Sequence, residues 1–185
     1  MAHESQRQYC LRVKKRFPKW FHKKKILDAG SLDINGSNRY LFTDCEYTGI
    51  DVGEGKNVDI VSTIHEFDAK DESYDVIIST ECFEHDMYYE KSLKNIVRML
   101  KPHGLFLFTC ATTGRFEHGT RRSAPGDAPL LNEKDTWQDY YKNLTEKDVR
   151  DSISIESNFL KHQFEIDTEH KDLQFWGIKK WKIKS

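Results

Sequence analysis

Hydrophobic residues in the first 110 positions form short runs that are separated by polar segments and by one clearly helical stretch. The strand-like runs cover 25–30, 47–52, 58–61, 74–79 and 105–109. The fourth run contains Val76-Ile77-Ile78, the continuous apolar pattern of a strand buried on both faces. Within 89–100, apolar residues recur at helical spacing, and Pro102 and Gly104 are expected to end that helix. Alternating strands and helices predict right-handed β-α-β units and a mostly parallel sheet.

Further elements are predicted within this region and after it. Helices are expected over 1–24 and 37–43, and the first has apolar residues that should face inward, namely Tyr9, Val13, Phe17, Trp20 and Phe21. Thr145 to Asp148 has the pattern of a capping box that begins a later helix. The runs 163–168 and 173–183 predict an antiparallel hairpin. Residues 1–185 are therefore expected to form one α/β domain, with a seven-stranded, mostly parallel sheet flanked by helices and an antiparallel last strand.

Residues 111–143 interrupt the alternation of strands and helices. This stretch has few periodic apolar positions and contains Gly114, Gly119, Pro125, Gly126 and Pro129. A connection of this length in a compact domain usually has a function. We therefore predict that it forms a lid over the substrate.

Composition narrows the class of protein. The chain is 37% hydrophobic and 32% charged, and it has neither an apolar run long enough for a membrane span nor the apolar segment of a secretory signal. Four cysteines lie far apart, at Cys10, Cys45, Cys82 and Cys110. This spacing suits reduced thiols better than a disulfide framework or a structural zinc site. We expect a cytoplasmic protein without membrane contact and without a metal site.

The net charge of −1 conceals a basic N-terminus. Residues 1–25 contain nine Lys or Arg residues and one acid, Glu4. Such a cluster can contact the phosphates of a nucleic acid, or it can be the solvated face of the first helix. The sequence leaves both explanations open and favours the second.

The chemistry is concentrated in residues 28–37, Asp-Ala-Gly-Ser-Leu-Asp-Ile-Asn-Gly-Ser. A strand that ends in Asp28-x-Gly30 and continues into a small-residue turn is typical of a nucleotide-cofactor crevice at the carboxyl edge of a sheet. Gly30 would allow the backbone to approach a ligand, and Gly36 would permit the turn. Asp51 ends the next strand 21 residues after Gly30, close to the roughly 20 residues expected for a ribose-binding acid.

The charges of this segment favour one cofactor class. The sequence lacks the G-x-G-x-x-G pattern of dinucleotide sites and the lysine of a P-loop. A diphosphate would also meet the like charges of Asp28 and Asp33. A ligand with sulfonium and ammonium groups suits these acids better, which favours S-adenosylmethionine over NAD.

These motifs resemble those of the class I, Rossmann-like S-adenosylmethionine-dependent methyltransferases over roughly residues 25–110. The glycine loop is similar to a G-S-x-D-x-N-G-S-x-R variant that begins at Gly30, and 74–79 resembles the family's fourth strand. Residues 80–85 are similar to its E-x-x-E-H segment. Residues 100–104 resemble its L-K-P-G-G turn, with His103 in place of a glycine.

The resemblance implies a set of cofactor contacts. Asp28, Gly30 and Ser31 would contact the methionine end, and Glu81 would lie near it. Asp51 would hold both ribose hydroxyls, and Val52 would pack on the adenine. The acid that often binds the adenine amino group is replaced by Ser62-Thr63-Ile64-His65, so backbone groups near Ile64 are expected to contact the base.

The implied activity is methyl transfer from S-adenosylmethionine to an oxygen or nitrogen nucleophile of a small molecule. His118 is predicted to contact the acceptor and take its proton, with His85 as the next candidate. Arg115 and Glu117 would orient His118 or bind the acceptor. Two alternatives stay open: an RNA methyltransferase that uses the basic N-terminus, and a binding module without turnover. The sequence does not predict an oligomeric state.

Overall fold

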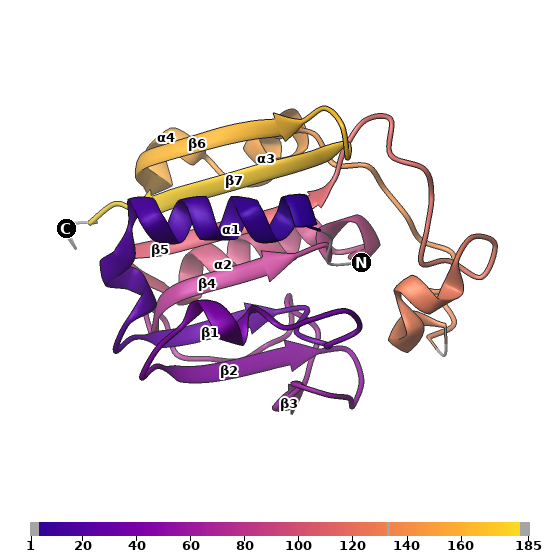
Figure 1. Cartoon of the computed structure of the whole chain (residues 1–185), viewed down its shortest axis with the longest axis horizontal. Coiled ribbons are helices and arrows are strands. Elements are labelled where there is room, and N and C mark those ends of the chain that lie inside the picture. The colour runs from indigo at the N-terminus through magenta and orange to yellow at the C-terminus, as the bar shows by residue number, and fades with distance from the viewer. Residues whose placement is uncertain (1–3, 133, 182–185) are drawn as a thin grey trace.

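The computed structural model describes residues 4–132 and 134–181 as a seven-stranded sheet with helices on both faces (Figure 1). The strands are β1 Lys25–Ala29, β2 Glu46–Asp51, β3 Ile60–Val61, β4 Tyr74–Thr80, β5 Leu100–Ala111, β6 Phe159–Asp167 and β7 Asp172–Lys179. Their order across the sheet is β3-β2-β1-β4-β5-β7-β6. β1 to β5 are parallel, and β7 runs antiparallel to both of its neighbours. The predicted fold class is confirmed.

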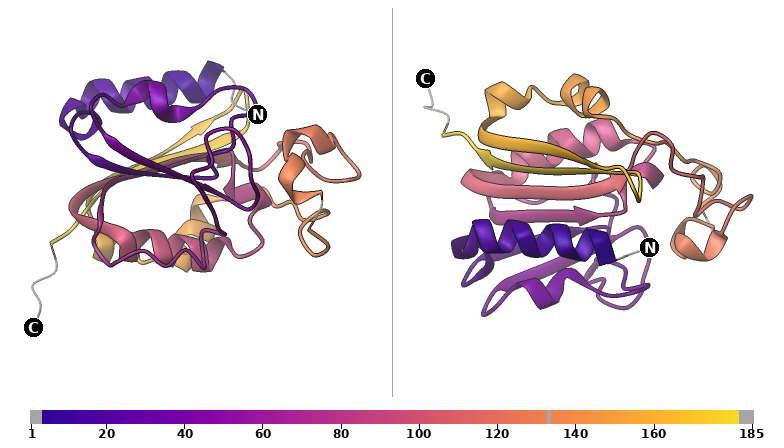
Figure 2. Two further views of the ribbon diagram at one scale, coloured as in Figure 1. Left: turned by 90° about the horizontal axis from the view of Figure 1, so that it is seen from below. Right: turned by 45° about the horizontal axis from the view of Figure 1, so that its top comes forward.

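Side-chain alternation along the strands explains the three layers seen in Figure 2. Val76 and Ile78 of β4 contribute to the cluster under α1 (Glu4–Arg16), whereas Ile77 belongs to the cluster on the other face. That second face is covered by α2 (Tyr89–Met99), α3 (Glu146–Ser152) and α4 (Ile155–Asn158). The central strands therefore need apolar residues at successive positions, as their sequence has.

The N-terminal helix is shorter than predicted. Within the described residues α1 ends at Arg16, and a short 3₁₀ helix, η1, follows over Pro18–Phe21. Pro18 accounts for the break, because proline disfavours helical backbone at the residue before it. Tyr9, Val13 and Phe21 are buried as predicted, and Phe17 and Trp20 pack half-buried against the same cluster.

The prediction of a helix over 37–43 was wrong. In this range the structure has a 3₁₀ helix, η2, over Asn38–Leu41. Ser37 caps its N-terminus, since the Ser37 hydroxyl accepts a hydrogen bond from the Arg39 N–H. Leu41 is fully buried in the cluster under α1, whereas Tyr40 is 45% exposed. One short turn buries the apolar side chain that faces the sheet, and α1 covers the rest of that face.

The elements predicted near the C-terminus are present. Thr145 and Asp148 form the reciprocal hydrogen bonds of a capping box at the start of α3. β6 and β7 form the predicted antiparallel hairpin. No helix among the described residues combines the length and the apolar character needed to cross a membrane.

Residues 111–132 and 134–143, called the lid segment below, leave the sheet after β5 and form a lobe beyond its carboxyl edge (Figure 1). The lobe contains two 3₁₀ helices, η4 (Pro125–Asp127) and η5 (Pro129–Leu131). It is fastened at its C-terminal end by backbone hydrogen bonds from Lys142 N to Glu84 O (2.8 Å) and from Leu144 N to Ala111 O (3.0 Å). Its place beside the carboxyl ends of the strands makes it one wall of the candidate site.

Candidate functional site

A pocket of about 940 Å³, including the space at its open mouth, lies at the carboxyl ends of β1, β2 and β4. Every residue predicted to bind the cofactor lines it: Asp28, Gly30, Ser31, Gly36, Asp51, Val52, Ile64 and Glu81. The strand order brings them together, because β1 lies between β2 and β4. Their role in binding stays a prediction.

Asp28 is a buried carboxylate at the floor of the pocket. It is 1% exposed and accepts hydrogen bonds from Tyr47 Oη (2.6 Å) and Asn38 Nδ2 (3.3 Å). Burial raises the pKa of Asp28 to about 7 despite these two hydrogen bonds. A positively charged ligand group beside Asp28 would stabilise its ionised form.

Gly30 is required by the packing of the protein itself. Its φ is +85°, and a Cβ there would lie 2.5 Å from the Cys82 Sγ atom. Ser31 donates a hydrogen bond to the Asn57 carbonyl oxygen (3.1 Å), so its hydroxyl also holds the loop after β2. Gly36, with φ +132°, has open space around the position of a Cβ, and its role is the turn itself.

Asp33 fastens this turn and is absent from the pocket lining. It accepts hydrogen bonds from Gly36 N (2.7 Å) and Asn57 Nδ2 (2.9 Å), and it pairs with Lys56 at 2.8 Å. The Lys56 ammonium is the main reason that the pKa of Asp33 is lowered. Because this charge is compensated, and because dinucleotide sites also carry an acid at the position of Asp51, Asp28 is the acid that disfavours a diphosphate here.

Asp51 is held at the end of β2 by the backbone. Its Oδ1 accepts from Val52 N (2.8 Å) and its Oδ2 from Leu32 N (3.0 Å). Burial raises the pKa of Asp51, and the two N–H groups oppose that shift. Each carboxylate oxygen retains a lone pair, so the pair can accept two further hydrogen bonds from adjacent hydroxyls.

The opposite end of the pocket is apolar. Val52 packs against the small cluster of Ala128, Leu131 and Trp137, all of which come from the lid segment. Ile64 is 6% exposed, and its carbonyl oxygen accepts from Asn95 Nδ2 at 2.7 Å. That oxygen keeps a second lone pair, and contact between a base and backbone groups near Ile64 stays a prediction.

Glu81 leaves β4 with a left-handed backbone, φ +51°, which is uncommon for a side chain of this kind. Its Oε1 accepts from Thr109 Oγ1 of β5 at 2.7 Å. This arrangement holds the carboxylate at the pocket wall beside Gly30 and Cys82.

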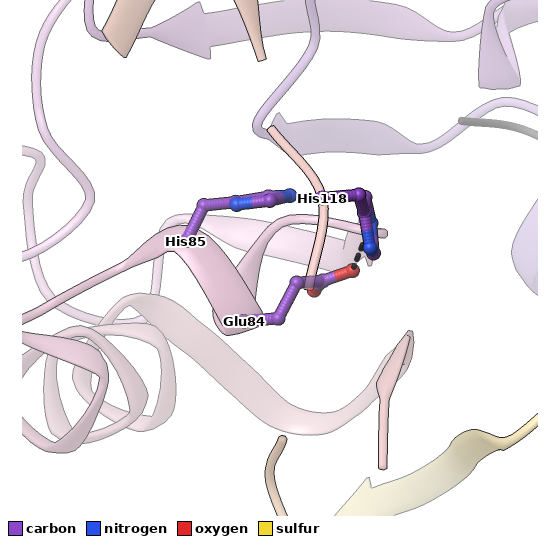
Figure 3. Close-up of side chains that lie close together, drawn as sticks. All are labelled: Glu84, His85 and His118. Carbon is purple, nitrogen blue, oxygen red and sulfur yellow. Dashed lines mark ion pairs between the residues drawn. The ribbon is translucent and has the colours of Figure 1, made fainter. Parts of the chain in front are cut away.

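Behind this wall, Glu84, His85 and His118 gather in a buried cluster, called the Glu-His-His cluster below (Figure 3). Glu84 and His85 lie in a 3₁₀ helix, η3 (Phe83–His85), and His118 comes from the lid segment. Burial, reinforced by the charge of Glu81, raises the pKa of Glu84 to about 8. Burial also lowers the pKa of His85 to about 3 and that of His118 below its usual value. His85 lines the pocket, but His118 does not.

The other two predicted acceptor contacts have partners away from the pocket. Arg115 donates to the His170 carbonyl oxygen (2.6 Å) and pairs with the buried Asp172 at 3.0 Å. Glu117 accepts from Thr120 Oγ1 (2.7 Å) and pairs with Arg122 at 3.0 Å. Neither side chain lines the pocket. Their contact with an acceptor stays a prediction, and these bonds disfavour it.

Many basic residues of the N-terminus are engaged with the sheet and its loops. Arg12 pairs with Glu165 at 3.4 Å, Arg16 lies over the Trp176 ring at 4.8 Å, and Lys25 pairs with Glu46 at 3.0 Å. These contacts fit the face of a structural helix. A phosphate-binding role stays a prediction.

Several residues that line the pocket could not be predicted from the sequence. Gln6 of α1 and Asn38 of η2 are polar and buried, and Trp137 belongs to the lid segment. The Gln6 Oε1 atom is buried without a hydrogen-bond partner. No local motif marks these positions, because only the packing of distant segments brings them to the pocket.

Comparison with known proteins agrees with this geometry. A family model described as a methyltransferase domain matches residues 1–144. No protein of curated function matches the sequence.

Three solved structures illustrate the similarity. The 1,6-didemethyltoxoflavin N1-methyltransferase of Burkholderia thailandensis, with bound 1,6-didemethyltoxoflavin and S-adenosylhomocysteine, has 14% identity and a TM-score of 0.63 over 95% of this chain and 78% of its own. The N-methyltransferase NodS of Bradyrhizobium japonicum, with S-adenosylhomocysteine, has 15% identity and a TM-score of 0.61 over 97% and 89%. Phosphoethanolamine N-methyltransferase 2 of Haemonchus contortus, with S-adenosylmethionine, has 16% identity and a TM-score of 0.66 over 94% and 53%.

At these identities the solved structures establish the fold, and the family model establishes the family. The resemblance predicted from the glycine loop and the strand motifs is thereby confirmed. The chain belongs to the methyltransferase-domain family, and its Rossmann-like fold is that of the class I S-adenosylmethionine-dependent methyltransferases.

Proposed function

We propose that the protein binds S-adenosylmethionine in this pocket and transfers its methyl group to a nucleophile of a small molecule. The observation that carries the proposal is the polarity of the pocket around Asp51. On one side of Asp51 lies the buried acid Asp28, and on the other lies the apolar wall of Val52, Ile64 and Trp137. S-adenosylmethionine has matching groups in the same order: a charged methionine, a ribose and a flat base.

The methionine end would be held by acids and amides. Asp28 is suited to the ammonium group, because a cation would offset the cost of its buried charge. The orphaned Gln6 Oε1 is a second acceptor on the same pocket. Asn38, which already donates to Asp28, keeps that carboxylate in place. These donors and acceptors fit the group without any change in their partners.

The ribose and the base would occupy the rest of the pocket. Asp51 can accept from two adjacent hydroxyls while its own backbone hydrogen bonds persist. Val52 and Trp137 provide apolar contact for the faces of a flat ring. The similar proteins solved with S-adenosylmethionine or S-adenosylhomocysteine support this choice of cofactor.

The cofactor supplies an already activated methyl group, so the protein mainly has to align the acceptor and exclude water. His85 is the histidine of the cluster that lines the pocket. We propose that the acceptor enters between His85 and the lid segment. A general-base role for His118 requires a path to the acceptor that its present position behind the wall does not provide.

Turnover tests the proposal directly. The full chain is incubated with S-adenosylmethionine and a panel of small phenols, hydroxy acids and amines, and the formation of S-adenosylhomocysteine is measured. We expect acceptor-dependent formation with at least one class, and its loss in Asp51→Ala. Binding of the cofactor without acceptor-dependent turnover across the panel would favour the binding module. Turnover with RNA instead would favour the nucleic-acid enzyme.

A further inference from the structure

We propose that the Glu-His-His cluster binds a divalent transition-metal ion beside the cofactor pocket. One ligand atom from each of Glu84, His85 and His118 lies within 4.8 Å of the others. All three residues are buried, at 0%, 6% and 8% exposure. Two imidazoles and a carboxylate are a ligand set that zinc and similar ions accept.

Several polar atoms of the cluster are buried without a hydrogen-bond partner. Both carboxylate oxygens of Glu84, the Nδ1 of His85 and the Nε2 of His118 are buried without a hydrogen-bond partner. The His118 Nε2 and Glu84 Oε1 atoms lie 3.9 Å apart, which is too long for a hydrogen bond. Buried polar atoms without partners are rare and costly in folded proteins. A cation held between the three side chains would bind one ligand atom from each, including the His118 Nε2 and one oxygen of Glu84.

The orientation of His118 is that of a metal ligand. Its Nδ1 lies 3.1 Å from the carbonyl oxygen of Phe116, and because a carbonyl only accepts, Nδ1 carries the hydrogen. The Nε2 atom therefore has its lone pair exposed toward Glu84. Metal-bound histidines typically donate the other ring N–H to a carbonyl or carboxylate in this way.

The surroundings hold the two histidines close. Gly119 has φ +67°, and a Cβ there would lie 2.6 Å from the Cε1 atom of His85, so the lid segment approaches this ring as closely as its backbone allows. The Tyr141 ring lies 5.6 Å from the His85 ring and 5.0 Å from the His118 ring. Figure 3 shows the three side chains converging from the two segments.

The spacing is slightly wider than that of a loaded site. Ligand atoms at about 2.1 Å from a tetrahedral ion lie about 3.4 Å apart. Small side-chain rotations that move each ligand atom by roughly an ångström would bring the three atoms to that separation. Three protein ligands leave one position open. Since His85 also lines the pocket, that position would face the acceptor and bind it through an oxygen atom. This last role rests on the proposed function, whereas the metal site does not.

Metal binding is tested on the chelator-treated full chain by calorimetric titration with Zn²⁺, and with Co²⁺ followed by its visible absorption. We expect one equivalent to bind. His118→Ala and Glu84→Gln should each weaken Zn²⁺ by more than about 100-fold, since loss of an outer-shell partner alone costs about 10–100-fold. The matched control is His162→Ala, which removes a histidine of β6 outside the cluster and should bind Zn²⁺ like the wild type. Mg²⁺ should bind far more weakly, because it prefers oxygen ligands.

Failure to bind Zn²⁺, equal affinity in the cluster variants, or a preference for Mg²⁺ would overturn the site. S-adenosylhomocysteine affinity is measured on the same samples, because neither Glu84 nor His118 lines the pocket. An unchanged affinity for S-adenosylhomocysteine in the two cluster variants shows that they remain folded. Wild type that binds S-adenosylhomocysteine but no Zn²⁺ overturns the metal site alone. Wild type that binds Zn²⁺ but no S-adenosylhomocysteine overturns the proposed function alone.

Discussion

Two backbone N–H groups hold the Asp51 carboxylate at the end of β2 and leave its remaining lone pairs for a ligand. Charge-assisted hydrogen bonds of the kind expected with two ribose hydroxyls contribute about 1.5–3 kcal/mol each. Asp51→Ala should therefore weaken S-adenosylhomocysteine by about tenfold or more, measured by calorimetry. The fold should survive, because Asp51 lies at a strand end.

A matched control for this variant is Asp75→Asn. Asp75 also accepts a backbone hydrogen bond, from Lys25 N at 2.9 Å, but it lies at the opposite end of the sheet near the start of β4. Its substitution should leave the affinity for S-adenosylhomocysteine unchanged. Equal affinities of Asp51→Ala and the wild type would contradict the ribose assignment.

Asp28 should make cofactor binding depend on pH. Its pKa is raised to about 7, so the carboxylate is mostly protonated at pH 6 and mostly ionised at pH 8. A ligand ammonium requires the ionised form, so affinity should fall as pH falls through 7, by about tenfold between pH 8 and pH 6. The charged and titratable groups that act on Asp28 are Tyr47, Asp51, Arg39 and Cys10.

The measurement is calorimetric titration with S-adenosylhomocysteine at pH 6, 7 and 8, for the wild type and Asp28→Asn. The variant removes the titrating group, so its affinity should be weaker at pH 8 and should lack the extra fall toward pH 6. A wild-type affinity that is constant, or stronger at pH 6, would argue against an ammonium beside Asp28.

At the scale of elements, the lid segment divides into two parts with different surroundings. Residues 127–131 and Trp137 line the pocket near Val52, whereas His118 belongs to the Glu-His-His cluster. Of the described residues, only Ala128, Leu131 and Trp137 form the small buried cluster on this side. A cluster of that size stabilises a segment weakly, so a ligand that fills the pocket should add to its protection.

Hydrogen exchange checks this expectation. Amides of 127–131 and of Trp137 should exchange more slowly when S-adenosylhomocysteine is bound, without any acceptor present, because these residues line the pocket near Val52. The turn at 168–171 between β6 and β7, which does not line the pocket, should exchange equally in both states. Equal exchange of 127–131 and Trp137 with and without ligand would refute a lid that orders on the cofactor.

At the scale of the whole molecule, the sequence predicted the sheet well because its central strands are buried on both faces. Val76-Ile77-Ile78 can lie in few other environments, and the Asp28 and Asp51 positions follow from where those strands end. The parts that local pattern could not predict depend on distant packing. The region after β1 has only η2, since α1 already covers that face.

The candidate site also has residues that local pattern predicts and residues that only distant packing brings together. Residues on the strand ends were found from spacing, but Gln6 and Trp137 reach the pocket from the N-terminus and from the lid segment. The Glu-His-His cluster joins positions more than thirty residues apart. No spacing rule connects His118 to Glu84, because only the path of the lid segment brings them together.

The central claim, that this pocket is built for S-adenosylmethionine, is tested most directly by calorimetric titration of the wild-type chain with S-adenosylhomocysteine and, in parallel, with NAD. The ammonium of the adenosyl ligand complements Asp28, whereas a diphosphate beside Asp28 would meet a like charge. We predict one equivalent of S-adenosylhomocysteine bound and no measurable binding of NAD. Binding of NAD in preference to the adenosyl ligand, or no binding of the adenosyl ligand, would contradict the claim.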